Sequence, residues 1–168
     1  MTTTPPPARG PAADLTRPPM GWNSWDSFGT TVTEAEVLAN AEFMAEHLAH
    51  FGWGTVVIDI DWSDPSARSH GYNEGAALVM DEHGLLQPDP VRFPSAAGGA
   101  GFAPLAARIH ALGLRLGIHV MRGIPRRAVA ANPPILGSGL RATDIAEPAN
   151  SCESNPHMVG IDHTVAGA

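Results

Sequence analysis

Residues 55–61 read Thr-Val-Val-Ile-Asp-Ile-Asp, an apolar run that acquires acidic side chains only at its carboxyl end. Such a run lacks the alternation of a half-exposed strand and is typical of a parallel sheet that is covered on both faces. The segment therefore predicts a buried parallel strand, which delivers Asp59 and Asp61 to one edge of the sheet.

Two amphipathic helices are predicted on either side of this strand. Before it, Thr33 and Glu36 have the spacing of a capping box, and Gly52 is suited to end the helix. The apolar face of this first helix comprises Val37, Ala41, Met44, Leu48 and Phe51. The second helix, which Gly113 would end, has an apolar face of Phe102, Leu105, Ala106, Ile109 and Leu112.

Two more strands are predicted, at residues 20–25 (MGWNSW) and at residues 114–121 (LRLGIHVM), the second of them buried. Residues 62–101 are rich in turn formers and predict a long loop with a small ribbon near residues 77–87, and residues 122–168 also have a loop-like pattern. The order strand, helix, strand, loop, helix, strand predicts an α/β fold with a parallel sheet.

Composition narrows the function classes. The 168 residues carry a formal charge of -7, from 17 acidic against 10 basic residues, and every basic residue is arginine. An acidic chain without a basic stripe argues against a nucleic-acid or membrane partner. Cys152 is the single cysteine, so no internal disulfide is expected. With no apolar span or export signal evident, we expect a cytoplasmic protein.

The chain divides into two parts by composition. Residues 1–18 are rich in proline and threonine and predict a disordered tail. Residues 19–168 contain the predicted strands and helices and form the expected domain.

Three motifs carry a resemblance to a known family: GWNSW at residues 21–25, VVIDIDW at residues 56–62 and LGIHVMRGIPR at residues 116–126. With them the chain resembles glycoside hydrolase family 27, the α-galactosidases, from about Arg17 onward. The resemblance implies an incomplete (β/α)8 TIM barrel with about the first three strands and two helices, since a whole barrel needs about 250 residues. It also implies retaining hydrolysis of terminal α-D-galactosides without a cofactor.

The same resemblance places the family's nucleophile and acid/base aspartates after the fourth and sixth strands, beyond these residues. We therefore expect a truncated glycosidase that is inactive alone and self-associates through the exposed sheet edge. A carbohydrate-binding remnant and one part of a split barrel are the alternatives. The sequence leaves open whether the parent substrate is an α-galactoside, an α-N-acetylgalactosaminide, a β-arabinopyranoside or an isomaltose-type glucoside.

Candidate substrate-binding residues follow the predicted strands. Side chains at the carboxyl ends of barrel strands meet in one pocket, so we expect convergence of Trp25, Asp59, Asp61, Trp62, His119 and Arg122. The resemblance assigns Trp25 and Asp59 to the galactose pocket and has Trp62 close its wall. It also marks two departures, His119 where many relatives have tyrosine and Ile60 where many have a second aspartate.

Structural readings of these residues stay open. Asp59 suits a strand-ending turn, Asp61 and His119 suit structural hydrogen bonds, and Arg122 suits a supporting salt bridge. A metal site at Cys152, His157 and His163 is disfavoured because no second cysteine pair accompanies it.

Overall fold

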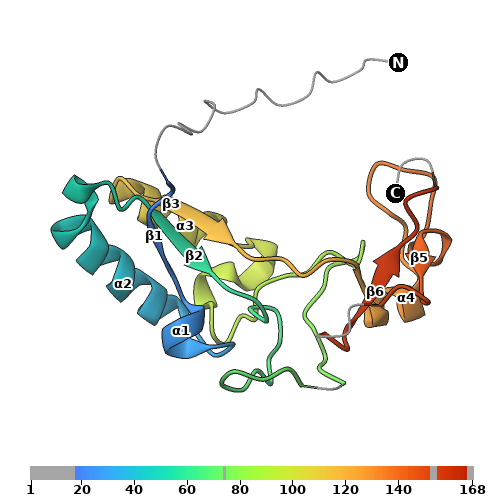
Figure 1. The fold of residues 1–168 in the computed structure, drawn as a ribbon. Coiled ribbons are helices and arrows are strands. Elements are labelled where there is room, and N and C mark those ends of the chain that lie inside the picture. Colours follow the sequence, from blue (N-terminus) through green and yellow to red (C-terminus); the bar gives the residue numbers. More distant parts are fainter. Residues whose placement is uncertain (1–17, 74, 152–154, 166–168) are drawn as a thin grey trace, which may run out of the picture.

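The computed structural model describes residues 18–73, 75–151 and 155–165. The predicted tail therefore lies outside the described residues except for Pro18, as does Cys152. A parallel sheet is formed by β1 (Gly21–Asn23), β2 (Thr55–Ile58) and β3 (Arg115–Ile118), in the order β1-β2-β3 (Figure 1). The α/β class and the three parallel strands agree with the sequence prediction.

Helix α2 (Glu34–His47) begins as predicted, with the Thr33–Glu36 capping box formed in both directions. It ends earlier than the apolar pattern suggests, and a 3-10 turn follows over Ala49–Phe51. The turn changes the helical period, so Phe51 is 67% exposed and does not join the buried face. Gly52 then ends the turn with a left-handed backbone, φ 97°.

Helix α3 (Ala103–Ala111) buries Leu105 and Ile109, whereas Leu112 lies past its end and is exposed. Both α2 and α3 contribute to one hydrophobic core with Val56 and Ile58 of β2, which are fully buried. The other β2 side chains are only partly buried. The prediction of a strand covered on both faces is therefore wrong, because both helices pack on the Val56 and Ile58 face.

The flanking strands also differ from prediction. β1 is only three residues long, because a short helix, α1 (Trp25–Phe28), takes over after Ser24. β3 was predicted to be buried, but its side chains are partly or fully exposed, and Ile118 is among the exposed ones. Within the described residues, β3 pairs only with β2, so it is an edge strand that lacks the cover of a second neighbour.

The long segment between β2 and α3 is irregular but closely pinned. An isolated antiparallel bridge joins Met80 to Leu86, which confirms the small ribbon. The Arg92 guanidinium donates hydrogen bonds to four backbone carbonyls, those of Thr30, Val32, Asp61 and Asp64. One largely buried arginine side chain, 12% exposed, thus fixes the chain after β2 to the connection before α2.

A second small lobe lies on the side toward which β2 and β3 point (Figure 1). Its sheet is antiparallel, in the order β4-β6-β5. The elements are β4 (Ile124–Pro125), α4 (Arg126–Ala131), a 3-10 turn over Ala142–Asp144, β5 (Ala146–Glu147) and β6 (Met158–Ile161). The loop-like prediction is wrong here, because strands of two to four residues are too short to show a period. Among the described helices, none has the length and apolar character that crossing a membrane requires.

Candidate functional site

An open hollow of about 430 Å³ lies at the carboxyl ends of the parallel strands. Its volume falls within the range typical of small-molecule sites. Its lining joins residues from the ends of all three strands with one residue of the long loop: Asn23, Trp25, Asp26, Asp59, Ile60, Tyr72 and His119. The hollow combines aromatic, carboxylate, amide and imidazole groups.

Asp59 is the centre of a hydrogen-bond network at this edge. Asn23 Nδ2 donates to Asp59 Oδ2 at 2.8 Å, and His119 Nδ1 lies 3.1 Å from Asp59 Oδ1. The backbone N–H of Ile60 also donates to Oδ1 at 2.8 Å, and the Asp59 N–H donates to the buried Ser24 hydroxyl. The carboxylate is thus held in place by groups from both neighbouring strands.

These contacts determine the protonation of Asp59. Burial raises its pKa, but the hydrogen bonds from Ile60, Asn23 and His119, with the charge of His119, outweigh burial and leave the pKa below its usual value. Asp59 is therefore an ionised hydrogen-bond acceptor at neutral pH. It is ill suited to donate a proton as a general acid.

Trp25 contributes a half-buried aromatic side to the hollow. Its backbone N–H donates to Asn23 Oδ1 at 2.8 Å, so the amide that holds Asp59 also fixes the start of α1. The imidazole of His70 lies edge-on to the indole, with ring centroids 5.6 Å apart. An indole beside a carboxylate matches the apolar and polar faces of a pyranose ring.

The six predicted residues do not all share this hollow. Trp25, Asp59 and His119 come together as expected. Trp62 packs in the hydrophobic core and donates from Nε1 to the His119 carbonyl at 2.9 Å, so it supports the end of β3 from within. Arg122 lines a separate hollow beside β6. The expectation of one common rim is corrected, because the chain turns away after each strand end.

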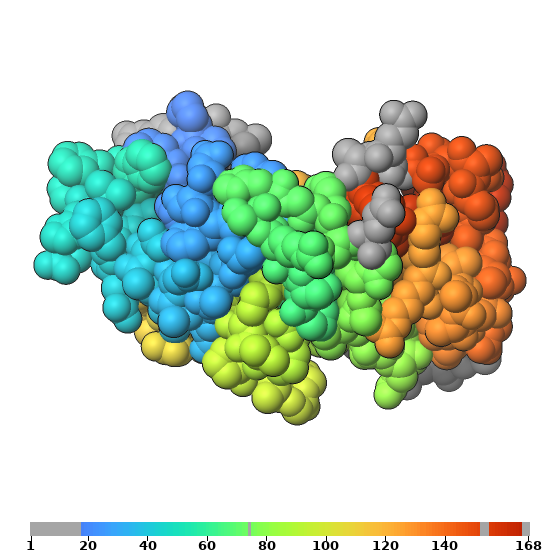
Figure 2. Space-filling model, turned by 90° about the horizontal axis from the view of Figure 1, so that it is seen from below, coloured from blue at the N-terminus to red at the C-terminus, as the bar shows by residue number. Residues whose placement is uncertain are grey.

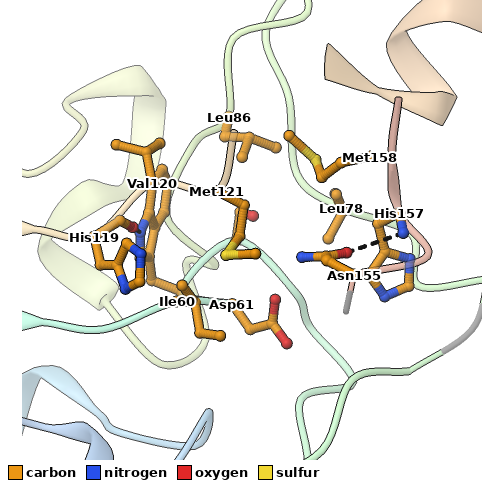
Figure 3. Close-up of a pocket in the computed structure, with 12 residues that line it drawn as sticks. Ile60, Asp61, Leu78, Leu86, His119, Val120, Met121, Asn155, His157 and Met158 are labelled. Atoms are coloured by element: carbon orange, nitrogen blue, oxygen red, sulfur yellow. Dashed lines mark hydrogen bonds between the residues drawn. The ribbon is translucent and has the colours of Figure 1, made fainter. Parts of the chain in front are cut away.

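Asp61 lies in a different environment, a small cavity between the lobes (Figure 3). Its backbone has a left-handed φ of 62°, which turns the side chain away from the hollow that Asp59 lines. The cavity volume is about 20 Å³, enough for one water molecule. Met121, Asn155 and His157 are among its lining residues. Asp61 Oδ2 and His157 Nε2 are buried and lack a hydrogen-bond partner within the described residues.

The protonation of Asp61 is correspondingly unusual. Burial and the nearby charge of Asp64 raise its pKa from 3.8 to about 6, against a smaller opposing effect of Arg92. A carboxyl group of this kind titrates close to neutral pH. It contrasts with Asp59, whose pKa is lowered.

Three lining residues were not singled out from the sequence: Asn23, Asp26 and Tyr72. Asn23 ends β1, and the rule that strand ends supply site residues would have identified it. Tyr72 comes from the irregular segment after β2, where no sequence period indicates its position. Within the described residues no cluster of three histidine, cysteine or acidic side chains could hold a metal ion.

Comparison with known proteins places this geometry in context. The model of the family described as Alpha galactosidase A (Melibiase_2) matches residues 17–138. Alpha-galactosidase 3 of Arabidopsis thaliana is 34% identical over 108 residues, which cover 64% of this chain and 21% of the relative. Alpha-galactosidase A of Cellvibrio japonicus is 36% identical over 103 residues, which cover 61% of this chain and 21% of that relative.

A solved structure is more similar. The GH27 β-L-arabinopyranosidase of Geobacillus stearothermophilus, crystallised as its D197A variant with arabinose, is 56% identical and superposes with a TM-score of 0.88. The match covers 90% of this chain and 35% of that one. The chain thus spans about a fifth of the length of the two alpha-galactosidases and about a third of the solved enzyme.

Proposed function

Because the chain belongs to the alpha-galactosidase family, glycoside hydrolase family 27, we propose that its strand-end hollow forms part of the sugar-binding site of a glycosidase. The observation that carries this proposal is the Asp59 carboxylate, held by Asn23 and His119 from the two neighbouring strands and flanked by Trp25. A fixed, ionised acceptor beside an indole suits the hydroxyls and the apolar face of a sugar. The parallel β1–β3 sheet with α2 and α3 would be the beginning of a TIM barrel.

The proposed substrate class is a terminal pyranoside with the ring stereochemistry that α-D-galactose and β-L-arabinopyranose share. The 56% identity to a β-L-arabinopyranosidase favours the arabinopyranoside, whereas the family model and the two alpha-galactosidases favour the galactoside. Apolar Ile60 beside Asp59 agrees with the smaller sugar, because it offers no polar partner to an additional hydroxymethyl group. We therefore rank the β-L-arabinopyranoside first.

Hydrolysis would need groups that the described part of the hollow does not supply. Retaining glycosidases use two carboxyl groups about 5 to 5.5 Å apart, one of them with a raised pKa. The hollow is lined by two carboxyl groups, Asp59 and the exposed Asp26 of α1, but the pKa of Asp59 is lowered, and Asp61, whose pKa is raised, lies in the other cavity. The 168 residues alone would therefore bind sugar without hydrolysing it.

The chromogenic glycosides p-nitrophenyl β-L-arabinopyranoside and p-nitrophenyl α-D-galactopyranoside test this proposal. The 168-residue chain should bind methyl β-L-arabinopyranoside in a calorimetric titration and release no nitrophenol above the blank. A polypeptide that continues into further family-like sequence should hydrolyse the arabinopyranoside faster than the galactoside. A folded chain that binds neither methyl glycoside contradicts the proposed function, and turnover by the chain alone contradicts the proposed division of roles.

The free edge of β3 supports a second property, self-association of the isolated chain. Ile118 and Val120 at its end are 42% and 57% exposed, and an unprotected strand edge is a template for pairing. Size-exclusion chromatography over a range of concentrations should show dimers or larger species. A monomer at all concentrations would contradict this property without affecting the sugar site.

A further inference from the structure

We propose that Tyr72 is a specificity-determining sugar contact, presented to the hollow by a hydrogen-bonded loop of residues 64–73, and that His70 of this loop positions Trp25. We refer to residues 64–73 as the Tyr72 loop. The inference rests on the proposed sugar-binding function and adds to it two residues outside the strand ends.

The Tyr72 loop is closed at its base by Asp64, a completely buried residue. Asp64 Oδ1 accepts hydrogen bonds from the backbone N–H and the hydroxyl of Ser66, each at 2.8 Å. Asp64 Oδ2 accepts a bond from Asn73 Nδ2 at 2.9 Å. The Asp64 carboxylate therefore ties the two ends of the loop together. The Asp64 backbone carbonyl in turn accepts a hydrogen bond from the Arg92 guanidinium.

The middle of the loop is attached to the chain after α1. The buried Thr30 hydroxyl donates to the Arg68 carbonyl. At Gly29, whose φ is 57°, a Cβ atom would lie only 2.5 Å from the backbone nitrogen of His70, so only glycine permits this approach. Figure 2 shows the segment around residues 65–73, in green, lying against the blue segment that contains α1. The loop is thus held in place by contacts within the protein itself.

His70 fixes the aromatic side of the hollow. Its own backbone is left-handed, φ 52°, and its Nδ1 lies 2.7 Å from the Ser69 hydroxyl. These constraints hold the imidazole edge-on against the Trp25 indole. An indole held from one side presents a defined face to a sugar, which reduces the ordering cost of binding.

Tyr72 enters the same hollow as Trp25, Asp59 and His119, but from the loop instead of a strand end. A phenol offers an apolar ring face and a hydroxyl that both donates and accepts hydrogen bonds. Sites built to hydrogen-bond a substrate hydroxyl reject analogues that lack it, so such a group contributes to discrimination between related sugars. The contacts of the loop fix the point from which Tyr72 approaches.

Calorimetric titration of the 168-residue chain and its variants with methyl β-L-arabinopyranoside and methyl α-D-galactopyranoside tests the Tyr72 assignment. Tyr72→Ala should weaken binding of the preferred sugar about tenfold, and Tyr72→Phe should change the ratio of the two affinities about threefold or more. Phe51→Ala, which truncates an exposed aromatic on the far side of the core, is the control and should leave both affinities unchanged.

The outcomes separate this inference from the proposed function. If the parent chain binds sugar and Asp59→Ala weakens binding about 100-fold, while Tyr72→Ala stays within twofold of the parent, the Tyr72 assignment is overturned and the sugar site stands. If the folded parent binds neither sugar, the proposed function and this inference fall together. A circular dichroism melt of each variant distinguishes lost binding from lost structure.

The positioning role of His70 has its own test. His70→Phe retains an edge contact with Trp25, whereas His70→Ala removes it. We expect about fivefold weaker sugar binding for His70→Ala and affinity within twofold of the parent for His70→Phe, with similar melting temperatures. Equal affinities for the two variants would overturn the positioning role.

Discussion

Asp59 and Asp61 are separated by one residue, yet their surroundings shift the pKa values of the two carboxyl groups in opposite directions. In the strand-end hollow, Asp59 is paired with Asn23 and His119 and its pKa is lowered. In the cavity between the lobes, Asp61 has an unpaired buried oxygen and a pKa raised to about 6. The hydrogen-bond donors around each carboxylate, and not its position in the sequence, decide whether it is a ready acceptor for a ligand.

The largest expected effect separates the two regions directly. Asp59→Ala removes an acceptor that is ionised and fixed, so sugar binding should weaken about 100-fold, as expected for the loss of two charge-assisted hydrogen bonds. Asp61→Asn is the matched control, because the Asp61 carboxylate lies outside the hollow. The dissociation constant of this variant for the sugar should equal that of the parent. Calorimetric titration measures both, and equal losses in the two variants would contradict the assignment of separate roles.

The next effect concerns the arginine that supports the region around Asp61. Arg92→Met removes the donor to four backbone carbonyls and leaves Asp89 without its ion pair. The free energy of unfolding should fall by about 3 kcal/mol, as for the loss of other buried polar networks. Urea denaturation followed by tryptophan fluorescence measures it. Arg108→Met removes an exposed partner of Glu34, whose buried carboxylate keeps the hydrogen bond from the Ser95 N–H, so stability should change by less than about 1 kcal/mol. A similar loss in both variants would argue against a special role of Arg92.

A smaller effect tests the protonation of Asp61. The Asp61 carboxyl group holds its proton more tightly in the folded chain than in the unfolded chain, where the pKa of this group is 3.8. The contribution to stability is therefore complete below pH 4 and is lost as the pH rises through about 6. Asp61→Asn should abolish this decline and raise the free energy of unfolding at pH 7 by about 2 kcal/mol, allowing for partial exposure. Parallel stability profiles of parent and variant between pH 4 and 7 would contradict the raised pKa.

The smallest effect sharpens the description of the hollow. His119→Gln keeps a hydrogen-bond donor but removes the imidazole and its charge, so sugar binding should weaken only about threefold to fivefold. A loss as large as that of Asp59→Ala would make the two residues equal partners in binding.

The sequence predicted the first lobe better than the second for physical reasons. The Thr33 capping box and the periodic apolar residues of α2 and α3 are local signals, and they located both helices. The β4-β6-β5 sheet depends on pairing between short strands far apart in the chain, which leaves no local period.

The candidate site was also predictable only in part. The strand-end rule found Asp59, Trp25 and His119, because parallel strands bring their ends to one edge. It misplaced Asp61 because the turn after β2 takes up a left-handed backbone that the residue pattern does not reveal. Tyr72 was missed because side-chain contacts of Asp64 and Thr30, and not an element of secondary structure, set its place.

The central claim, that the strand-end hollow binds the sugar and the cavity between the lobes does not, is tested most directly by nuclear magnetic resonance. Backbone amide signals of the 15N-labelled chain would be followed during titration with methyl β-L-arabinopyranoside. We expect progressive shifts at Asn23, Asp59 and Tyr72, which line only the hollow, with little change at Asn155 and Met158, which line only the cavity. Shifts confined to Asn155 and Met158, or none at saturating sugar, would contradict it.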